Sequence, residues 1–489
     1  MTPPCPRLRP AFYTCPRTAA WRALRWVVAL AITQHAQAAN WPQLRGPSAS
    51  AVAVGNGTAP VHFGPQTNRL WSTALPPGHS SPVIWGDHLF LTGVEDKKLV
   101  TLALRRSTGK LLWSRSAPAE KLEAAHRISN PAAPTACTDG ERVIVYFGSY
   151  GLLAYDFEGR ELWRHPLPAP IVEFGASSSP ILAGDRVIQL CDGDLNSFLL
   201  AVDKRTGRQV WKTPRPEHRR GFSTPFLWQN EGREEIIANG NIRVTSYHPE
   251  NGQVLWSSRG LARVANASPA AGNGLLFVGS WNIGGDAGDR IVVPAFVEFM
   301  AQQDKNRDGK LDKEEFPPGP FRDRFTQFDL DKDGAVTRAE YEGMAEQFVQ
   351  AENALFAIRP GGSGNLSESH IVWKHTRSLP YIASPLHHQG RLYTVRSGGM
   401  VTCYDAKSGN VLFRDERLGA TGDYYSSLLA AGDHIYAISQ SGIATVFKAG
   451  APLQVVARNE MGEGVMSTPA IVDGRIYLRT EKHLMCFGK

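Results

Sequence analysis

Apolar and polar residues alternate in short stretches along most of this chain, and turn pairs such as Gly-Asp, Asn-Gly and Asp-Gly separate the stretches. Six stretches begin with small residues, usually followed by a proline: SSPVIWGDHLFLTG (80–93), SSPILAGDRVIQL (178–190), ASPAAGNGLLFVG (267–279), ASPLHHQGRLYTV (383–395), SSLLAAGDHIYAI (426–438) and STPAIVDGRIYLR (467–479). A period of two predicts half-buried strands, and the turn pairs predict antiparallel hairpins.

A second pattern follows most of these hairpins and ends in a large aromatic residue. Its copies are ALRRSTGKLLW (103–113), AYDFEGRELW (154–163), AVDKRTGRQVW (201–211), SYHPENGQVLW (246–256) and CYDAKSGNVLF (403–413). The glycine suits a tight turn that needs a positive φ, and the aromatic residue offers an apolar plate to a neighbouring unit. Hairpin and turn motif together make four strands in about 45 residues, the size of one β-propeller blade.

The number of units predicts a closed ring of eight blades. The blades are expected at 80–115, 130–166, 177–213, 222–258, 266–376, 383–416, 426–459 and 467–487. The last unit ends before a Trp-bearing strand, whereas segment 68–72 carries an unmatched Trp71. We expect this segment to complete the eighth blade. An open solenoid or a sandwich would leave the position of Trp71 unexplained.

The fifth unit is too long, because 117 positions separate Trp256 from Trp373. Its excess contains two 12-residue loops, 304–315 and 329–340, that fit the EF-hand pattern at every diagnostic position. Calcium takes six to eight oxygen ligands at about 2.3–2.6 Å. The predicted side-chain ligands are Asp304, Asn306, Asp308, Asp312 and Glu315 in the first loop and Asp329, Asp331, Asp333, Thr337 and Glu340 in the second, with backbone carbonyls from Lys310 and Ala335. About two calcium ions are expected.

Apolar residues at helical spacing flank both loops and predict short helices. Pro317-Pro318 must cut the helix that leaves the first loop very short. Leu311 and Val336 are expected to pair as a short strand between the loops. The predicted fold is therefore an all-β, eight-bladed β-propeller of four-stranded antiparallel blades, with a small α-helical EF-hand pair inserted in blade five.

The N-terminal residues change the meaning of the formal net charge of +7. Five arginines precede the apolar run Trp26–Ile32, which a small-residue site, Ala36-Gln37-Ala38, follows. This order predicts a secretory signal peptide, and the apolar run is too short to span a bilayer. We expect a soluble, exported protein, periplasmic or secreted. Without the five arginines the charge is close to balanced, which argues against nucleic-acid binding.

The expected organisation is a signal peptide at 1–38, the N-terminal part of the propeller at 39–290, the EF-hand pair at 291–350 and the C-terminal part of the propeller at 351–489. Beyond the predicted leader, Cys137, Cys191, Cys403 and Cys486 stand far apart, and we expect free thiols. We expect no membrane span and a monomer.

The repeat resembles a known family. AVDKRTGRQVW (201–211) is similar to the docking motif of eight-bladed quinoprotein-type propellers, and WPQLRGP (41–47) and CTDGERVIVYFGSYGLLAYDFEGRELW (137–163) resemble exported PQQ-like repeat proteins of the BamB type. The resemblance covers roughly residues 40–489, apart from the insertion. It implies the propeller fold, whereas it says little about function, because one fold serves many functions.

Three functional hypotheses follow. The first is a non-catalytic calcium-binding propeller that presents a face to a protein or glycan partner. The second is a PQQ-dependent oxidoreductase. The resemblance implies that such dehydrogenases carry an adjacent Cys-Cys pair and acidic and amide calcium ligands in the central channel. This chain has no adjacent cysteines, and we do not expect it to bind PQQ. The third is a BamB-like scaffold for outer-membrane protein assembly. His126 is a weak candidate for a residue near the channel. The sequence favours the first hypothesis.

Overall fold

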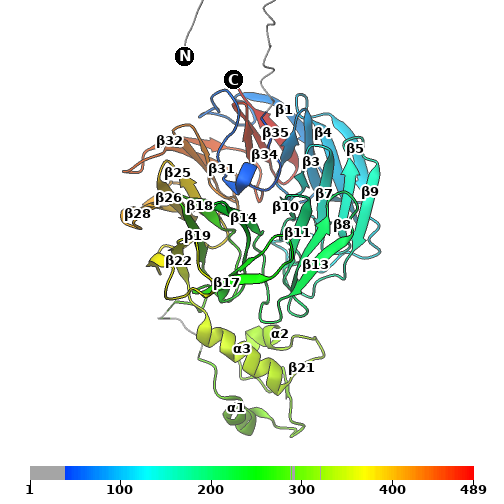
Figure 1. The fold of residues 1–489 in the computed structure, drawn as a ribbon, viewed down its shortest axis with the longest axis vertical. Helices are drawn as coiled ribbons and strands as arrows, with labels where there is room; N and C mark the ends of the chain where they lie inside the picture. The colour runs from blue at the N-terminus through cyan, green and yellow to red at the C-terminus, as the bar shows by residue number, and fades with distance from the viewer. Residues whose placement is uncertain (1–38, 287, 289–291, 320) are drawn as a thin grey trace, which may run out of the picture. The chain divides into compact units, whose positions relative to one another are not determined.

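The computed structural model describes residues 39–286, 288, 292–319 and 321–489, so the predicted signal peptide lies outside the described residues. Eight sheets of mainly antiparallel strands follow one another along the described chain (Figure 1). They are called blades one to eight below. The eight-bladed propeller that the repeats predict is therefore confirmed.

Blade one contains β2 (Val83–Trp85), β3 (His88–Glu95), β4 (Lys98–Arg105) and β5 (Leu111–Ser116), and blade two contains β6 (Cys137–Thr138), β7 (Arg142–Phe147), β8 (Gly151–Asp156) and β9 (Glu161–Pro166). Blade three contains β10 (Ile181–Ala183), β11 (Arg186–Cys191), β12 (Phe198–Asp203) and β13 (Gln209–Pro214). Blade four contains β14 (Phe226–Asn230), β15 (Arg233–Asn239), β16 (Arg243–Tyr247) and β17 (Val254–Arg259).

Blade five contains β18 (Ala270–Gly272), β19 (Leu275–Ser280), β22 (Ala354–Ile358) and β24 (Ile371–His375), and blade six contains β25 (Leu386–His388), β26 (Arg391–Arg396), β27 (Met400–Asp405) and β28 (Val411–Arg417). Blade seven contains β29 (Leu429–Ala431), β30 (His434–Ile438), β31 (Ile443–Lys448) and β32 (Val455–Glu460). Blade eight contains β33 (Ala470–Val472), β34 (Arg475–Arg479), β35 (His483–Phe487) and β1 (Arg69–Ala74).

The eighth blade joins the two ends of the propeller. Its outer strand, β1, pairs antiparallel with β35, and Trp71 lies opposite Cys486. The prediction that segment 68–72 completes this blade is therefore confirmed. This pairing covers the edge of β35, which would otherwise expose unpaired backbone groups, and it ties the first strand of the propeller to the last.

Five blades attach to the next one through a Trp on the outer strand. In one case the indole N–H of Trp163 donates to the carbonyl of Lys204 at 2.9 Å. The same ring covers Gly207, whose φ is +68°, and a Cβ there would lie 2.5 Å from the ring. The other four pairs are Trp71 with Gly109, Trp113 with Gly159, Trp211 with Gly252 and Trp373 with Gly409. The turn glycine is therefore required by its backbone conformation and by this contact.

Blade four departs from this arrangement. The indole N–H of Trp256 donates to buried Glu235 within its own blade, at 2.6 Å. A short segment of blade five, β23 (Gly364–Asn365), pairs in parallel with β17 instead. Blade four thus has five strands, one more than the four that the repeat predicts, because the fifth repeat lacks the usual turn and its longer loop reaches back to β17.

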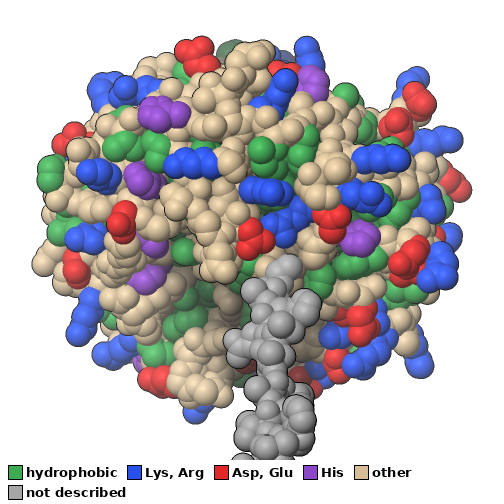
Figure 2. Space-filling view, turned by 90° about the horizontal axis from the view of Figure 1, so that it is seen from above, with side chains coloured by type: hydrophobic (Ala, Val, Ile, Leu, Met, Phe, Trp, Pro, Cys, Tyr) green, Lys and Arg blue, Asp and Glu red, His purple; other side chains and the backbone are tan. Residues whose placement is uncertain are grey.

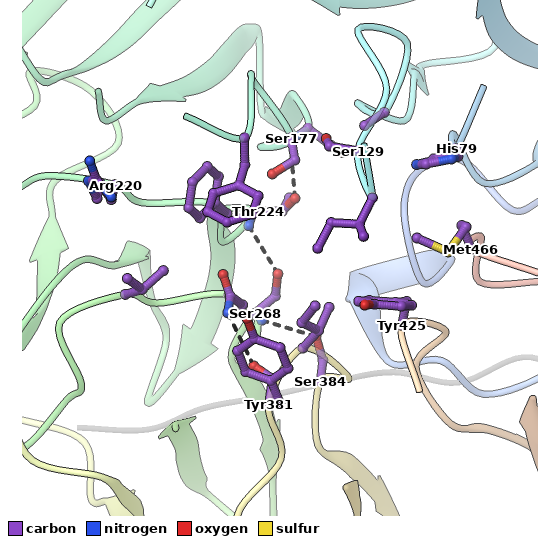
Figure 3. A pocket seen from close by; sticks show the side chains of 18 of the residues that line it. His79, Ser129, Ser177, Arg220, Thr224, Ser268, Tyr381, Ser384, Tyr425 and Met466 are labelled. Carbon is purple, nitrogen blue, oxygen red and sulfur yellow. Dashed lines mark hydrogen bonds between the residues drawn. The ribbon is translucent and has the colours of Figure 1, made fainter. Parts of the chain in front are cut away.

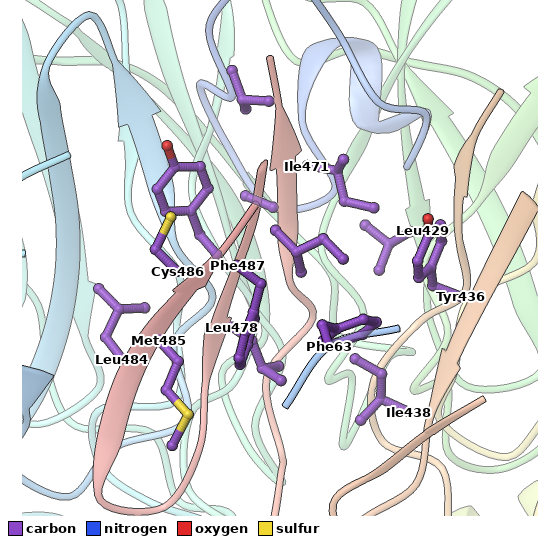
Figure 4. Packing of buried hydrophobic residues seen from close by; sticks show 14 of the residues in the cluster. Phe63, Leu429, Tyr436, Ile438, Ile471, Leu478, Leu484, Met485, Cys486 and Phe487 are labelled. Atoms are coloured by element: carbon purple, nitrogen blue, oxygen red, sulfur yellow. The ribbon is translucent and has the colours of Figure 1, made fainter. Parts of the chain in front are cut away.

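Blade seven carries Ala457 at the register position of the Trp, opposite Val446. Phe63, from the segment before β1, packs in the same cluster as Ala457, between blades seven and eight (Figure 4). Its ring centroid lies 5.1 Å from that of Phe487. The Asn459 side chain holds the segment, because it accepts from the Phe63 N–H at 3.1 Å and donates to the Val61 carbonyl at 2.9 Å. Phe63 thus fills the place that a Trp fills elsewhere.

A ring of eight hydrogen bonds joins the inner ends of the blades. In each blade one hydroxyl oxygen accepts from the backbone N–H of the equivalent residue in the preceding blade, at 2.9–3.1 Å. The eight residues, called the hydroxyl ring below, are Ser81, Thr135, Ser179, Thr224, Ser268, Ser384, Ser427 and Thr468. The small residues before each hairpin in the sequence therefore serve contacts between blades.

The segment before the first blade also contacts the inner ends of the blades. Arg45 is fully buried, and its guanidinium donates to the carbonyls of Pro269 at 2.9 Å and Pro385 at 2.6 Å. Burial lowers the pKa of Arg45 to about 10. Trp41 pairs with Ile84 of blade one, and a 3₁₀ turn follows at η1 (Pro47–Ala49). The WPQLRGP motif therefore holds blades one, five and six together.

The insertion in blade five lies between β19 and β22. It contains α1 (Phe296–Gln303), β20 (Leu311–Asp312), η2 (Arg322–Arg324), α2 (Phe325–Phe328), β21 (Ala335–Val336) and α3 (Arg338–Gln350). Eight fully or nearly buried aromatic and aliphatic side chains from these elements, together with Phe316, form a core of their own. The chain after the first loop makes a turn rather than a helix, as Pro317-Pro318 requires.

Acidic and basic side chains are interspersed on the face that Figure 2 presents, and they do not gather into a patch of one sign. Within the described residues, no helix is both long and apolar enough to cross a membrane. Cys137, Cys191, Cys403 and Cys486 are all buried and free, as predicted.

Candidate metal centre and central cavity

The two predicted calcium loops have the same internal geometry. The first residue of each loop accepts from the backbone N–H of the loop glycine at 3.2 Å: Gly309 donates to Asp304 Oδ2, and Gly334 donates to Asp329 Oδ2. The other oxygen of each carboxylate, Oδ1, is buried and has no hydrogen-bond partner. A buried carboxylate oxygen without a partner is costly, so both loops present an oxygen suited to a cation.

Alternate residues turn toward the same space in the second loop. Carboxylate oxygens of Asp329, Asp331 and Asp333 lie within 4.8 Å of one another, a spacing that suits one metal ion. Asp329 is 5% exposed, and burial raises its pKa above the usual value. In the first loop Asn306 stands between the two carboxylates, and its amide nitrogen donates to Asp308 Oδ2 at 3.1 Å.

The last residue of each loop folds back across it. Glu315 Oε1 accepts from the N–H of Lys305 at 2.8 Å, and Glu340 Oε1 accepts from the N–H of Leu330 at 2.9 Å. The second oxygen of each carboxylate is bound at the ninth loop position, since Asp312 N donates to Glu315 Oε2 at 3.1 Å and Thr337 N donates to Glu340 Oε2 at 2.8 Å. These bonds fix each carboxylate against its own loop.

The loops are also tied to each other. Leu311 pairs with Val336, and Asp312 pairs with Ala335, in the antiparallel bridge of β20 with β21. The predicted pairing of Leu311 with Val336 is therefore confirmed. Lys310 of the first loop reaches Asp333 of the second, with Nζ 3.4 Å from Oδ2.

The donor set fits calcium. Hard oxygens from carboxylates, an amide, a hydroxyl and backbone carbonyls are the ligands that this ion prefers. The structure brings three predicted ligands of the second loop together at metal spacing, and it places the other predicted residues around the same two loops. Coordination of calcium by the twelve residues stays a prediction.

Polar and ring contacts join the insertion to the propeller. Lys332, in the second loop, lies with Nζ 3.7 Å from Oδ2 of buried Asp194. Arg263 donates to Gln327 Oε1 at 3.2 Å, and its guanidinium lies over the Phe348 ring, 4.2 Å from the centroid. The second loop and its helices therefore pack beside the propeller residues 194 and 263.

A cavity of about 370 Å³ lies at the inner ends of the blades (Figure 3). All eight members of the hydroxyl ring line it. Its other walls include Phe174, Phe222, Tyr381 and Tyr425, and Leu44 lies at its surface beside the buried Arg45. Arg324 and Gln327 of the insertion line it as well. Sequence reasoning missed this cavity, although the recurring Ser and Thr before each hairpin are its sequence signal.

The arginines of the cavity differ in their partners. Arg220 is paired with Asp194, Nε to Oδ1 at 2.6 Å, and with Glu173, Nη1 to Oε2 at 3.2 Å. Arg263 donates to neutral oxygens, and burial together with the charges of Arg324 and Arg220 lowers its pKa to about 10. His126 does not line the cavity, but its ring packs on Phe174, which does, with centroids 5.0 Å apart.

Fold and loops together define an eight-bladed propeller that carries an EF-hand pair. The family model "Outer membrane protein assembly factor BamB" matches residues 55–242 and 351–487, more than half of the chain, and the model "EF hand" matches residues 296–316 and 321–345. The chain therefore belongs to the BamB family of PQQ-like propellers, with an EF-hand pair inserted in the fifth blade.

Solved structures share the fold at low sequence identity. BamB from Moraxella catarrhalis is 11% identical, with a TM-score of 0.55, and the match covers 86% of this chain and 99% of that one. Quinohemoprotein alcohol dehydrogenase ADHIIG from Pseudomonas putida HK5 is 10% identical, with a TM-score of 0.55, covering 92% of this chain and 80% of that one. The corresponding enzyme from Comamonas testosteroni is 12% identical, with a TM-score of 0.54, covering 93% and 81%. No curated protein matches the sequence significantly.

Proposed function

We propose that this protein is an exported calcium-binding propeller that acts as a non-catalytic binding or scaffold protein. One observation carries the calcium part of the proposal: in both loops the first residue keeps a buried carboxylate oxygen without a partner, Asp304 Oδ1 and Asp329 Oδ1. The EF-hand family match covers both loops and supports the same proposal. Export is proposed from the charge and hydropathy pattern of residues 1–38.

The cavity supports a non-catalytic role over quinone-dependent oxidation. The related dehydrogenases hold their quinone beside calcium ligands in the channel, as the resemblance implies. Of the described residues that line the cavity here, Glu173 is the one carboxylate, and it is paired with Arg220. Amide oxygens of Asn266 and Asn282 also line the cavity, but the one lining carboxylate is already engaged by an arginine, which favours the non-catalytic role. The EF-hand carboxylates lie in the insertion, outside the cavity lining.

A scaffold role in outer-membrane protein assembly is the second candidate. The family match to an assembly factor favours it. A protein or glycan on a propeller face fits either role, and the face that Figure 2 presents carries no basic patch of the kind that nucleic acid needs. Deletion of the gene should lower the insertion of outer-membrane proteins if the chain is such a scaffold, whereas unchanged insertion would leave the calcium-dependent binding role.

Calcium titration by calorimetry tests the calcium proposal directly. We expect about two ions to bind per chain, with dissociation constants of about 10⁻⁴–10⁻³ M, as in other extracellular EF-type modules. The double variant Glu315→Gln, Glu340→Gln removes two charges but keeps the side-chain shape, and we expect it to weaken binding by at least about tenfold, because ligand charge sets the affinity.

The matched control is Glu314→Gln, Glu342→Gln. Both residues are exposed neighbours of the predicted ligands, so the control removes the same charge from the same module. It should bind calcium like the unaltered chain. Equal affinity of the two double variants would contradict the proposal. An absorbance scan of the purified protein checks for a bound quinone, and a redox-active adduct would contradict the non-catalytic role.

A further inference from the structure

A second cavity, of about 600 Å³, lies between the segment before the first blade and the inner strands of blades one to six. It is separate from the central cavity, because no described residue lines both. We propose that the second cavity binds a neutral saccharide, a short chain of uncharged sugar rings. The inference rests on the proposed binding role and gives that role a site and a class of ligand.

The wall that the N-terminal segment contributes to the second cavity is fixed by backbone hydrogen bonds. The N–H of Thr138 in blade two donates to the carbonyl of Pro42 at 2.9 Å. Farther along the segment, Val52 pairs with Ala430 of blade seven. Pro42, Val52 and Thr138 all line the cavity. The cavity is therefore formed before a ligand arrives, which lowers the entropic cost of binding.

The lining of the second cavity carries no charge. Of the described residues that line it, none is acidic and none is a lysine or an arginine. His387 is the titratable side chain among them, and its Nε2 lies 2.8 Å from Asn273 Oδ1. Burial, and next the charge of His388, lowers the pKa of His387, so its ring is neutral near neutral pH. An ionic ligand would lose its hydration here without gaining an opposite charge, so the lining selects against it.

Two tryptophans contribute large rings to this lining. Trp85 ends β2, and its ring packs against Gly140 of blade two, where a Cβ would lie 2.5 Å from the ring. Trp228, in β14, meets Trp256 edge to face, with centroids 6.4 Å apart. These contacts hold both rings in place. Tryptophan offers a large, rigid apolar surface, which suits the C–H face of a sugar ring.

The polar groups that remain free in the second cavity are uncharged as well. Within the described residues, the indole N–H groups of Trp85 and Trp228 and the side-chain amide of Gln43 make no hydrogen bond. Trp228 is only 2% exposed, and a buried indole N–H usually has a partner. An indole donates and an amide both donates and accepts, so together they match hydroxyl groups, which do both. A sugar combines such hydroxyl groups with an apolar ring face, and the volume of the cavity is in the range of ligand sites.

The test measures binding of cellotriose, maltotriose and chitotriose by calorimetry on the full chain, with trigalacturonate as the charged counterpart of the same length. We expect at least one neutral trisaccharide to bind at least about tenfold more tightly than trigalacturonate, whose carboxylates would lose hydration without gaining a partner. Its affinity should be the same in about 0.5 M sodium chloride, because the interaction includes no ion pair. Binding of none of the neutral trisaccharides, or equal binding of trigalacturonate, would overturn the proposal.

Trp85→Ala and Trp228→Phe assign the binding to the second cavity. Trp85→Ala removes an aromatic wall, whereas Trp228→Phe keeps a ring and removes the indole N–H. Each should weaken binding of the neutral trisaccharide by about fivefold or more. The matched control is Trp281→Phe, just after β19, which removes an indole N–H that donates to Asp286 Oδ2 at 3.2 Å and lies outside the lining. It should leave the affinity unaltered.

Circular dichroism checks that each variant is folded. If both cavity variants fold and bind the trisaccharide like the control, the proposed site is wrong. Calcium titration and the absorbance scan are measured separately from saccharide binding. A chain that binds calcium, carries no redox-active adduct and binds no trisaccharide would therefore contradict this inference and leave the proposed function intact.

Discussion

The buried charged side chains of this protein differ in their hydrogen-bond and ion-pair partners. Arg45 donates to two proline carbonyls, Arg220 meets two carboxylates, and Arg263 meets only neutral groups. The same contrast holds for acids, since Asp194 is paired with Arg220, whereas Asp329 keeps one buried oxygen without a partner. Burial without an opposite charge is costly, so the calcium proposal rests on a residue of this second kind.

Glu123 is a buried carboxyl group that makes the stability of the protein depend on pH. Burial raises its pKa to about 7, although the Ala176 N–H donates to its Oε2 at 3.3 Å. The usual value is 4.5. Between pH 4.5 and 7 the folded protein therefore holds a proton that the unfolded chain releases, and stability falls as pH rises through this range.

The variant Glu123→Gln removes this dependence and keeps an oxygen for the Ala176 N–H. Relative to the unaltered protein, its free energy of unfolding should rise by about 3 kcal/mol between pH 4.5 and pH 8. Chemical unfolding at several pH values measures the difference. Glu120→Gln, at an exposed position three residues earlier, should show no such rise. If the free energy of unfolding depends on pH in the same way for both variants, the burial of Glu123 is not the cause of the dependence.

At the scale of elements, the turn glycines connect blades as well as strands. Gly207 and Gly184 both lie in turns of blade three with positive φ, +68° and +57°. A Cβ at Gly207 would meet the Trp163 ring of the preceding blade at 2.5 Å, whereas a Cβ at Gly184 would meet nothing within 4 Å. The pair therefore separates the cost of backbone conformation from the cost of contact between blades.

Both Gly184→Ala and Gly207→Ala should lower the free energy of unfolding by about 1–2 kcal/mol, because an L-residue is disfavoured at positive φ. Gly207→Ala must also displace the Trp163 ring, which we expect to cost about 1–3 kcal/mol more. Thermal unfolding should show a larger loss for Gly207→Ala. Equal losses would mean that the Trp docking adds nothing to stability at this position.

Elements with a local sequence pattern were predictable, and contacts between distant segments were not. Hairpins, turn glycines, Trp71 in the closing strand and the pairing of Leu311 with Val336 follow from short-range spacing. The extra strand β23 was not predicted, because pairing in parallel with β17 leaves no signal in its own residues. Phe63 filling the place of a Trp beside Ala457 is hidden for the same reason.

For the candidate site, the loop ligands were predictable because the EF-hand places them at fixed positions in 12 consecutive residues. The cavity was not, because its lining residues come from all eight blades, the N-terminal segment and the insertion. Each of its Ser and Thr residues is unremarkable alone. Only the closed ring shows that they share one wall.

At the scale of the whole molecule, the insertion that carries the predicted calcium loops also contacts the central cavity. The second loop holds Lys332 beside Asp194, which pairs with Arg220 of the cavity. The flanking helices α2 and α3 carry Gln327 and Phe348 to Arg263. Since metal binding and local folding are coupled in small modules, calcium should order the same helices that contact Arg263.

Calcium should therefore slow the local opening of these helices. We expect removal of calcium by a chelator to speed amide hydrogen exchange in α3 by about fivefold or more and to leave exchange in β8 of blade two unchanged, because α3 belongs to the metal-binding module and β8 does not. Glu315→Gln, Glu340→Gln should abolish this response to calcium, whereas Glu314→Gln, Glu342→Gln should retain it. Hydrogen exchange followed by mass spectrometry, with and without calcium, measures the rates in each segment. Equal exchange of α3 in both conditions would show that calcium does not order the insertion, despite the contacts of Arg263 with α2 and α3.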